Sequence, residues 1–147
     1  MAHGSQLTRQ NVGFLLAKAT QRWNELLRRR FVEEGFGQVS PHYGSVLVPL
    51  YEEDGIPMGE LARRARLSKQ TMTTMIRQME RDRLAVRRPD AEDGRVTRVF
   101  LSPRARAFRP VAERVLGELG RAMDRSAAGL SSAAARRWLG AMADLEV

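Results

Sequence analysis

The segment that decides the fold is residues 59–83, GELARRARLSKQTMTTMIRQMERDR. Its second half has apolar residues at steps of three and four, which predicts a helix with one buried side: Met72, Met75, Ile76 and Met79. Ser68 is a typical N-cap residue, so we expect this helix to begin there and to reach about Arg83. Residues 59–64 predict a shorter helix and residues 65–67 a turn. Two helices joined by a short turn are typical of a helix-turn-helix.

The other side of the longer helix carries hydrogen-bonding and cationic residues without a carboxylate. At about 100° per residue, this side is centred on Gln70, Thr74, Arg77 and Arg81, with Lys69, Thr73 and Gln78 at its flanks. Glutamine can bond to adenine, arginine to guanine, and threonine to base edges or the thymine methyl group. Ser68, Lys69 and Thr71 lie at the helix N-terminus, where free N–H groups favour a phosphate. The alternative is a merely solvated helix face, but the preceding helix and turn favour a recognition helix.

After this helix the apolar period changes to two, which predicts a β-hairpin. Residues 84–87 and 96–101 are rich in β-branched residues, and residues 89–95 form turns readily. Arg87, Arg88 and Arg98 lie on or beside the strands. Asp93 and Arg95 lie at the tip, where an arginine suits a narrow minor groove and the aspartate could orient it through a salt bridge. The alternative for Asp93 is a turn-forming role alone.

Four further helices are expected, two before this region and two after it. An apolar stripe marks residues 12–31, Ser40-Pro41 starts a second helix, Ser102-Pro103 starts a long one that ends near Gly129, and Ser131 or Ser132 caps the last. The terminal helices are long for so small a centre, so we expect a second copy of the chain to cover them in a homodimer. A monomer in which they fold onto the centre is the alternative.

The overall charge indicates a polyanionic partner, because the formal net charge is +8 and the excess lies in one segment. Between Pro57 and Arg106 there are 13 lysines and arginines against 6 acidic residues, whereas the rest of the chain holds 12 and 11. No membrane-length apolar run or signal peptide is visible, so we expect a cytoplasmic protein that does not bind membranes. With no cysteine and two histidines, neither a metal nor a cofactor is expected.

An enzyme is the first rival interpretation. Its acidic cluster, residues 52–54, is better explained as a solvated helix end, and the sequence lacks a phosphate-binding glycine loop or a nucleophile elbow. We therefore expect no catalytic site. The second rival is a sequence-indifferent architectural DNA-binding protein, or a protein adaptor, on the same fold.

Residues 59–73, 79–95 and 101–102 closely resemble the MarR family of transcriptional regulators. The resemblance implies a mainly α fold with a small β-hairpin wing: one domain, residues 1–147, with a winged helix-turn-helix at 40–102 and dimerisation helices at 8–35 and 103–147. It also implies a homodimer on a pseudo-palindromic double-stranded DNA operator, often as a repressor, with Asp93 and Arg95 as the wing motif. One departure is Val96, which replaces a frequent acidic residue and puts the wing's internal salt bridges in question.

The resemblance further implies that a small phenolic or other aromatic acid releases the DNA. Trp23, His42, Tyr43 and Arg106 could line its cleft, although aromatic residues on helix faces are more often part of a core.

Overall fold

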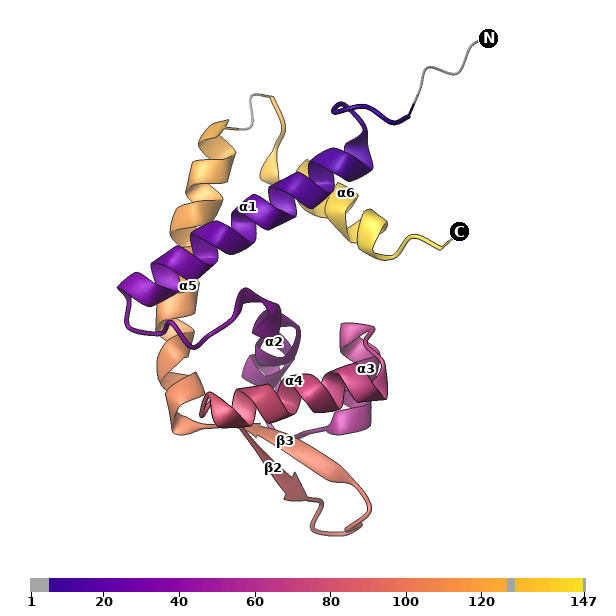
Figure 1. Cartoon of the computed structure of the whole chain (residues 1–147), viewed down its shortest axis with the longest axis vertical. Coiled ribbons are helices and arrows are strands. Elements are labelled where there is room, and N and C mark those ends of the chain that lie inside the picture. Colours follow the sequence, from indigo (N-terminus) through magenta and orange to yellow (C-terminus); the bar gives the residue numbers. More distant parts are fainter. Residues whose placement is uncertain (1–5, 127–128, 147) are drawn as a thin grey trace. The chain divides into compact units, whose positions relative to one another are not determined.

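The computed structural model describes residues 6–126 and 129–146, in two compact units, Met1–Ala112 and Glu113–Val147. The elements in chain order are α1 (Val12–Glu33), η1 (Pro41–Tyr43), α2 (Gly44–Glu52), β1 (Ile56–Pro57), α3 (Met58–Ala65), α4 (Lys69–Arg81), β2 (Ala85–Pro89), β3 (Thr97–Leu101), α5 (Pro103–Ser126) and α6 (Ser132–Ala143). Figure 1 labels the six α-helices and the strands β2 and β3. The fold is mainly helical with a small antiparallel sheet, which confirms the expected fold class. None of the helices in the described ranges is long and apolar enough to cross a membrane.

Two helices, α4 and α6, begin where the sequence predicts, because serine side-chain oxygens cap their free N–H groups. Ser68 accepts a hydrogen bond from the Thr71 N–H at the start of α4, and Ser131 accepts one from the Ala134 N–H at the start of α6. Ser40 caps η1, so the helix expected after it begins as a short 3₁₀ turn that leads into α2.

The end of α4 differs from the prediction. The helix stops at Arg81 rather than near Arg83, because Arg83 adopts a positive φ of 60° and the chain turns back. The Leu84 N–H bonds to the Met79 carbonyl and the Arg83 N–H to the Glu80 carbonyl, which is the hydrogen-bond pattern of a left-handed helix cap.

The sheet has three strands in the order β1-β3-β2, where only a hairpin was expected. β2 and β3 form that hairpin, with Arg88 opposite Arg98, and β1 adds Ile56 opposite Val99 on the other side of β3. β1 is too short to show an alternating pattern and contains Pro57, so its pairing depends on tertiary contacts that the sequence pattern does not reveal.

The apolar side of α4 forms the centre of the first unit's core. Met72, Ile76 and Met79 are buried together with Leu61 of α3, Leu84 and Val99. Met75 is only half-buried, so its assignment to the core was too strong: it lies at the border of the apolar side and lines a hollow with Gln70 and Gln78. Burial of the other three fixes the rotation of α4 and leaves its polar side outward.

The end of α1 packs on the first turns of α5 through aromatic rings. The ring of Phe31 meets the ring of Phe108 edge to face at 4.8 Å between centroids, and Phe36 lies 5.2 Å from the same ring. In the second unit, α6 has no buried residue, and Asp124 of α5 accepts a hydrogen bond from the Ser132 hydroxyl.

Candidate nucleic-acid interface

The exposed side of α4 is the first part of the candidate interface. α3 ends at Ala65, and the next residue, Arg66, has a left-handed conformation (φ 53°) that turns the chain through Leu67 into α4. Figure 1 shows α4 next to the β2–β3 hairpin, which extends beyond the helices. Thr73 is half-buried, and the other six polar residues predicted on this side are exposed: Lys69, Gln70, Thr74, Arg77, Gln78 and Arg81.

The cations of α4 differ from those of α3 in what they contact. Lys69, Arg77 and Arg81 form no salt bridge with any residue that the structure describes. On α3, by contrast, Glu60 accepts hydrogen bonds from Arg63 at 2.5 Å and Arg64 at 2.9 Å, and these bonds lower its pKa to about 2. The positive charge of α4 is therefore available to an external anion, while much of that on α3 is already compensated.

The threonines of α4 differ in whether they form hydrogen bonds within the helix. The Ser68 hydroxyl donates to Thr71 Oγ1 at 2.8 Å, and the Thr73 hydroxyl donates to the Lys69 carbonyl at 2.8 Å. Both contacts stabilise the first turn. The Thr74 hydroxyl is exposed and forms no hydrogen bond within the described chain, so it is the threonine best placed to meet a base edge.

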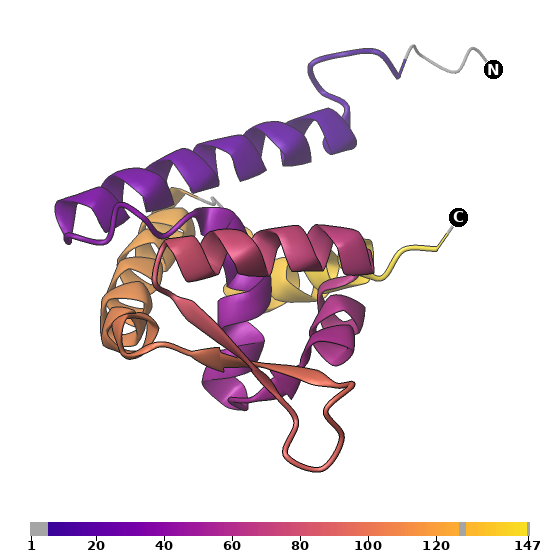
Figure 2. The same ribbon diagram turned by 60° about the horizontal axis from the view of Figure 1, so that its bottom comes forward.

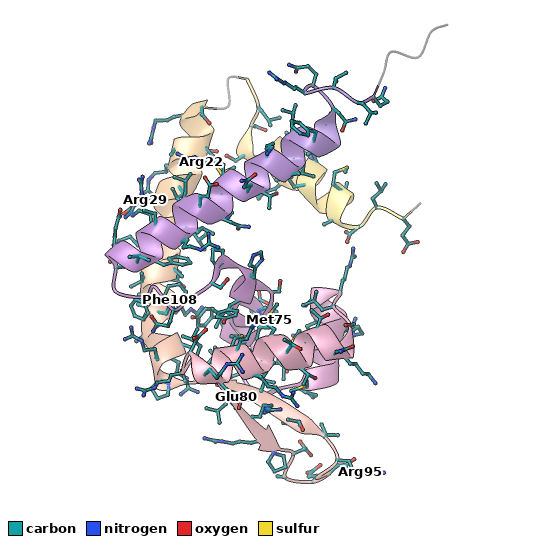
Figure 3. All side chains as sticks on the ribbon, viewed as in Figure 1. Arg22, Arg29, Met75, Glu80, Arg95 and Phe108 are labelled. Carbon is teal, nitrogen blue, oxygen red and sulfur yellow. The ribbon has the colours of Figure 1, made fainter. Side chains whose placement is uncertain are left out.

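The tip of the hairpin, which we call the wing, presents Arg95. The structure shows the expected ion pair: Asp93 accepts from Arg95 Nε at 3.0 Å and from Nη2 at 3.1 Å. These hydrogen bonds lower the pKa of Asp93 and raise that of Arg95, so both groups stay charged. Figure 3 shows Arg95 projecting from the wing tip, where 91% of its side chain is exposed.

A second ion pair stabilises the wing despite the apolar Val96. Asp90 accepts from Arg98 Nε, and its other oxygen accepts from the N–H groups of Glu92 and Asp93 at 3.1 and 3.0 Å. Hydrogen bonding to Arg98, followed by these amides, lowers the pKa of Asp90. The wing's internal salt bridges are therefore present and do not need an acidic residue at position 96.

The other two predicted arginines of the hairpin are engaged elsewhere. Arg87 pairs with Glu80 of α4, and Arg88 lies over the ring of Phe100 at 5.4 Å. Arg87 therefore links the hairpin to α4 and has less charge to offer an anion, whereas Arg88 remains exposed.

A cavity of about 480 Å³ lies between the wing and the start of α4. It brings together cations from two elements, Lys69 of α4 and Arg95 of the wing. The remaining lining residues come from β1, α3, α4, the wing and the start of β3: Pro57, Met58, Gly59, Thr73, Val96 and Thr97. Figure 2, turned so that the bottom of Figure 1 comes forward, shows the loop of the hairpin extending beyond α3 and α4. A chain of phosphates could pass between two such cations.

The four candidate ligand residues have different surroundings. The buried Tyr43 donates a hydrogen bond to Asp82 at 2.5 Å, and Arg106 pairs with Asp54 at 2.7 Å. His42 is exposed and Trp23 half-buried. Among the described residues, no hydrogen bond joins any two of these four, and their ligand role stays a prediction.

The sequence pattern missed two residues that shape the interface, Glu80 and Asp90, and it placed Arg98 on the hairpin without indicating what that residue contacts. Each acts through a contact between elements, Glu80 with β2, Asp90 with β3, and Arg98 with the chain before β1. The available signal was the alternation of charge across the hairpin, where Asp90 and Arg98 have opposite signs near paired strand ends.

Two helices, a three-stranded sheet and an extended wing define the class of winged helix-turn-helix proteins. The sequence model of the MarR family matches residues 39–97. The winged helix-turn-helix region of this chain is therefore similar to the MarR family of transcriptional regulators, as expected from residues 59–73, 79–95 and 101–102.

Solved structures share this fold over nearly the whole chain. The chain is similar to a probable transcriptional regulator from Pseudomonas aeruginosa, with 27% identity, a TM-score of 0.70, and coverage of 93% of this chain and 98% of that one. It shares its fold with the repressor CouR bound to a 23-mer DNA duplex (24% identity, TM-score 0.69, coverage 95% and 97%). PcaV from Streptomyces coelicolor, solved with its natural ligand, has the same fold (18% identity, TM-score 0.68, coverage 98% and 96%). No curated protein matches the chain by sequence.

Proposed function

We propose that the chain is a homodimeric repressor that binds a pseudo-palindromic operator in double-stranded DNA. In each subunit, α4 enters the major groove, with Gln70, Thr74, Arg77 and Arg81 toward the bases. Ser68, Lys69 and Thr71 position the helix on a phosphate, and Arg95 enters the neighbouring minor groove. Arg88 adds a backbone contact, while Arg87 and Thr73 support the two elements through their internal contacts.

One observation carries this proposal: the fully polar side of α4 and Arg95 of the wing are both exposed and border the same cavity through Lys69 and Thr73. A solvated helix face alone does not explain three unpaired cations on α4 beside a wing that presents a fourth. The repressor CouR, which shares this fold, is bound to a 23-mer DNA duplex, and this supports the proposal.

The dimer part of the proposal rests on the terminal helices. In α1, Val12, Phe14 and Leu15 are exposed, and in α6 the same holds for Trp138 and Leu139. Apolar side chains exposed at this density in both terminal regions favour burial against a second copy. Two-fold symmetry then implies two half-sites about one helical turn apart, roughly 10 base pairs centre to centre.

We also propose that a small aromatic acid weakens DNA binding. Trp23, His42, Tyr43 and Arg106 supply the aromatic rings and the guanidinium that such a ligand needs, and the fold accommodates a natural ligand in PcaV. Release of bound DNA by a panel of benzoic and hydroxybenzoic acids tests this part. Release that is lost in Arg106→Ala supports it, and the absence of release by every acid contradicts it.

Selection of bound duplexes from a random pool tests the main proposal. We expect an enriched inverted repeat and an affinity for it that exceeds that for random duplex by about 10³-fold or more at physiological salt. Enrichment of no sequence, with equal affinity for all duplexes, would favour the architectural alternative. If the protein binds no duplex even at low salt, the remaining alternative is a protein adaptor on the same fold.

A salt titration separates the two DNA-binding alternatives further. Phosphate contacts make log K fall steeply with log salt for any duplex, whereas base contacts persist for the selected site. Parallel titrations of the selected site and of a scrambled duplex therefore show a gap in affinity that remains as salt rises, if base edges are read.

A further inference from the structure

The wing loop is organised by the side chain of Asp90. This carboxylate is only 17% exposed although it lies at the start of a loop, and it accepts the N–H groups of Glu92 and Asp93. The backbone closes the same loop, with the Asp90 N–H bonding to the Val96 carbonyl at 2.8 Å and the Val96 N–H to the Asp93 carbonyl at 3.0 Å. The position of Asp90 therefore determines where the backbone of Asp93 lies.

Arg98 connects Asp90 to the rigid part of the sheet. Its Nε donates to Asp90, and its Nη1 donates to the Gly55 carbonyl at 2.7 Å. Gly55 is buried and is held in turn by Asp54, whose Oδ1 accepts from the Gly55 N–H at 3.0 Å and from the Leu101 N–H at 2.8 Å. One guanidinium thus bridges the wing loop and the chain before β1.

The same chain of contacts reaches Arg95. The Asp93 N–H is fixed on Asp90, and the Asp93 carboxylate holds Arg95 through Nε, Nη2 and the Arg95 N–H, the last at 3.1 Å. An exposed ion pair alone fixes a side chain weakly, because water competes for both groups. The direction of Arg95 therefore depends on how firmly the backbone beneath Asp93 is held.

We propose that Arg98 is a positioning residue for DNA binding, which acts through Asp90 and Asp93 to aim Arg95 at the minor groove. This inference rests on the proposed function of the wing. According to this proposal, the contact of Arg98 with the buried Gly55 determines the direction of the Arg95 side chain at the wing tip. It also gives Asp90, an acidic residue close to the DNA, a favourable role.

The contacts of Arg98 argue against a direct phosphate contact. Its side chain is 39% exposed, against 91% for Arg95, and two of its donors are already bonded inside the chain. It also lies opposite Arg88 in the register of β2 and β3, so the charge of Asp90 offsets the repulsion between two facing arginines.

A double-mutant cycle on DNA affinity tests the proposal, with each variant first checked for an unchanged melting transition. We expect Arg98→Gln to weaken binding by about three- to tenfold when Arg95 is present and to have almost no further effect in Arg95→Ala. Arg88→Gln is the matched control: it removes one positive charge from the same hairpin, and its loss should add fully to that of Arg95→Ala. Equal losses from Arg98→Gln in both backgrounds would show a direct contact and overturn the proposal.

Asp90→Ala supplies a second test with an opposite electrostatic expectation. Removal of a negative charge near DNA should strengthen binding by charge alone. We expect weaker binding instead, because Arg95 loses its orientation. Stronger binding by Asp90→Ala would overturn the inference.

Amide hydrogen exchange in the free protein separates this inference from the proposed function. The Asp93 and Arg95 N–H groups should exchange faster in Arg98→Gln than in the wild type, although their own acceptors are unchanged. Faster exchange without DNA binding by the wild type would refute the proposed function and leave the link between Arg98 and the wing intact. Unchanged exchange in Arg98→Gln would refute the link itself.

Discussion

At the scale of single residues, the cations of this surface differ in whether an acidic side chain of the same chain pairs with them. Acidic partners hold the arginines of α3 and Arg87, whereas Lys69, Arg77 and Arg81 of α4 are unpaired within the described chain. Arg95 combines both properties: it is paired with Asp93, yet 91% of its side chain remains exposed. An external polyanion therefore meets four accessible cations on α4 and the wing.

Arg95→Ala should weaken binding to all duplexes, since a wing arginine contacts the minor groove and backbone rather than a distinctive base edge. We expect the slope of log K against log salt to decrease in magnitude by about one. Fluorescence anisotropy with selected and scrambled duplexes at several salt concentrations measures it. An effect confined to the selected duplex would contradict this role.

Gly55→Ala should destabilise the fold by about 1 to 3 kcal/mol. Gly55 has a φ of +75°, and an added Cβ would lie 2.6 Å from the Phe100 ring. Urea unfolding measures the free energy. Gly59→Ala is the control, because Gly59 is helical and its Cβ would meet open space, so its stability should be equal or higher by up to about 1 kcal/mol. Equal stability of Gly55→Ala and wild type would contradict the proposed close contact.

At the scale of elements, the contact between Tyr43 of η1 and Asp82 fixes the end of α4. Burial raises the pKa of Tyr43 to about 12, and the hydrogen bond to Asp82 acts in the same direction. Because the folded pKa lies above the unfolded value of 10.0, the stabilisation is complete below pH 10 and is lost as pH rises toward 12.

Tyr43→Phe should therefore lose less stability than the wild type between pH 10 and pH 12. Melting temperatures of both proteins across this range measure the difference. At neutral pH, loss of the hydrogen bond should cost the variant about 1 kcal/mol. Parallel alkaline curves for the two proteins would show that Tyr43 has no raised pKa.

The elements that repeat a pattern were predictable, and those that depend on distant pairing were not. The apolar period of α4 and its Ser68 cap placed the helix correctly, because burial of one side and capping are local effects. β1 has two residues and no sequence pattern of its own, and it is a strand only through its pairing with β3. The left-handed Arg83, which shortens α4, has no glycine signal in the sequence.

In the candidate site, too, the features set by local sequence were predictable and those set by contacts between elements were not. The polar side of α4 and the Asp93–Arg95 pair follow from spacing along one helix and one turn, so the sequence was sufficient to place them. The links from Asp90 to Arg98 and from Glu80 to Arg87 join different elements, and residue type alone did not indicate them. The DNA roles of all these residues remain predictions.

At the scale of the whole molecule, the proposed dimer predicts that a charge on α6 separates the subunits. Leu139 is 42% exposed and apolar, so Leu139→Glu should shift the sedimentation behaviour from dimer to monomer and weaken binding to a two-half-site operator. Val48→Glu is the matched control: Val48 is 55% exposed on α2, outside the proposed dimerisation helices, and its variant should remain a dimer. A wild type that sediments as a monomer at micromolar concentration would contradict the proposed dimer.

The central claim is that the polar side of α4 reads base edges, and the base-pair preferences of Gln70→Ala and Arg77→Ala test it most directly. Each variant is compared with the wild type on the selected operator and on duplexes changed at one base pair at a time. We predict that each variant loses about 1 to 3 kcal/mol on the operator and loses its preference at a few particular base pairs, which differ between the two variants. If both variants keep the affinity and the preferences of the wild type at every position, α4 does not read the DNA sequence.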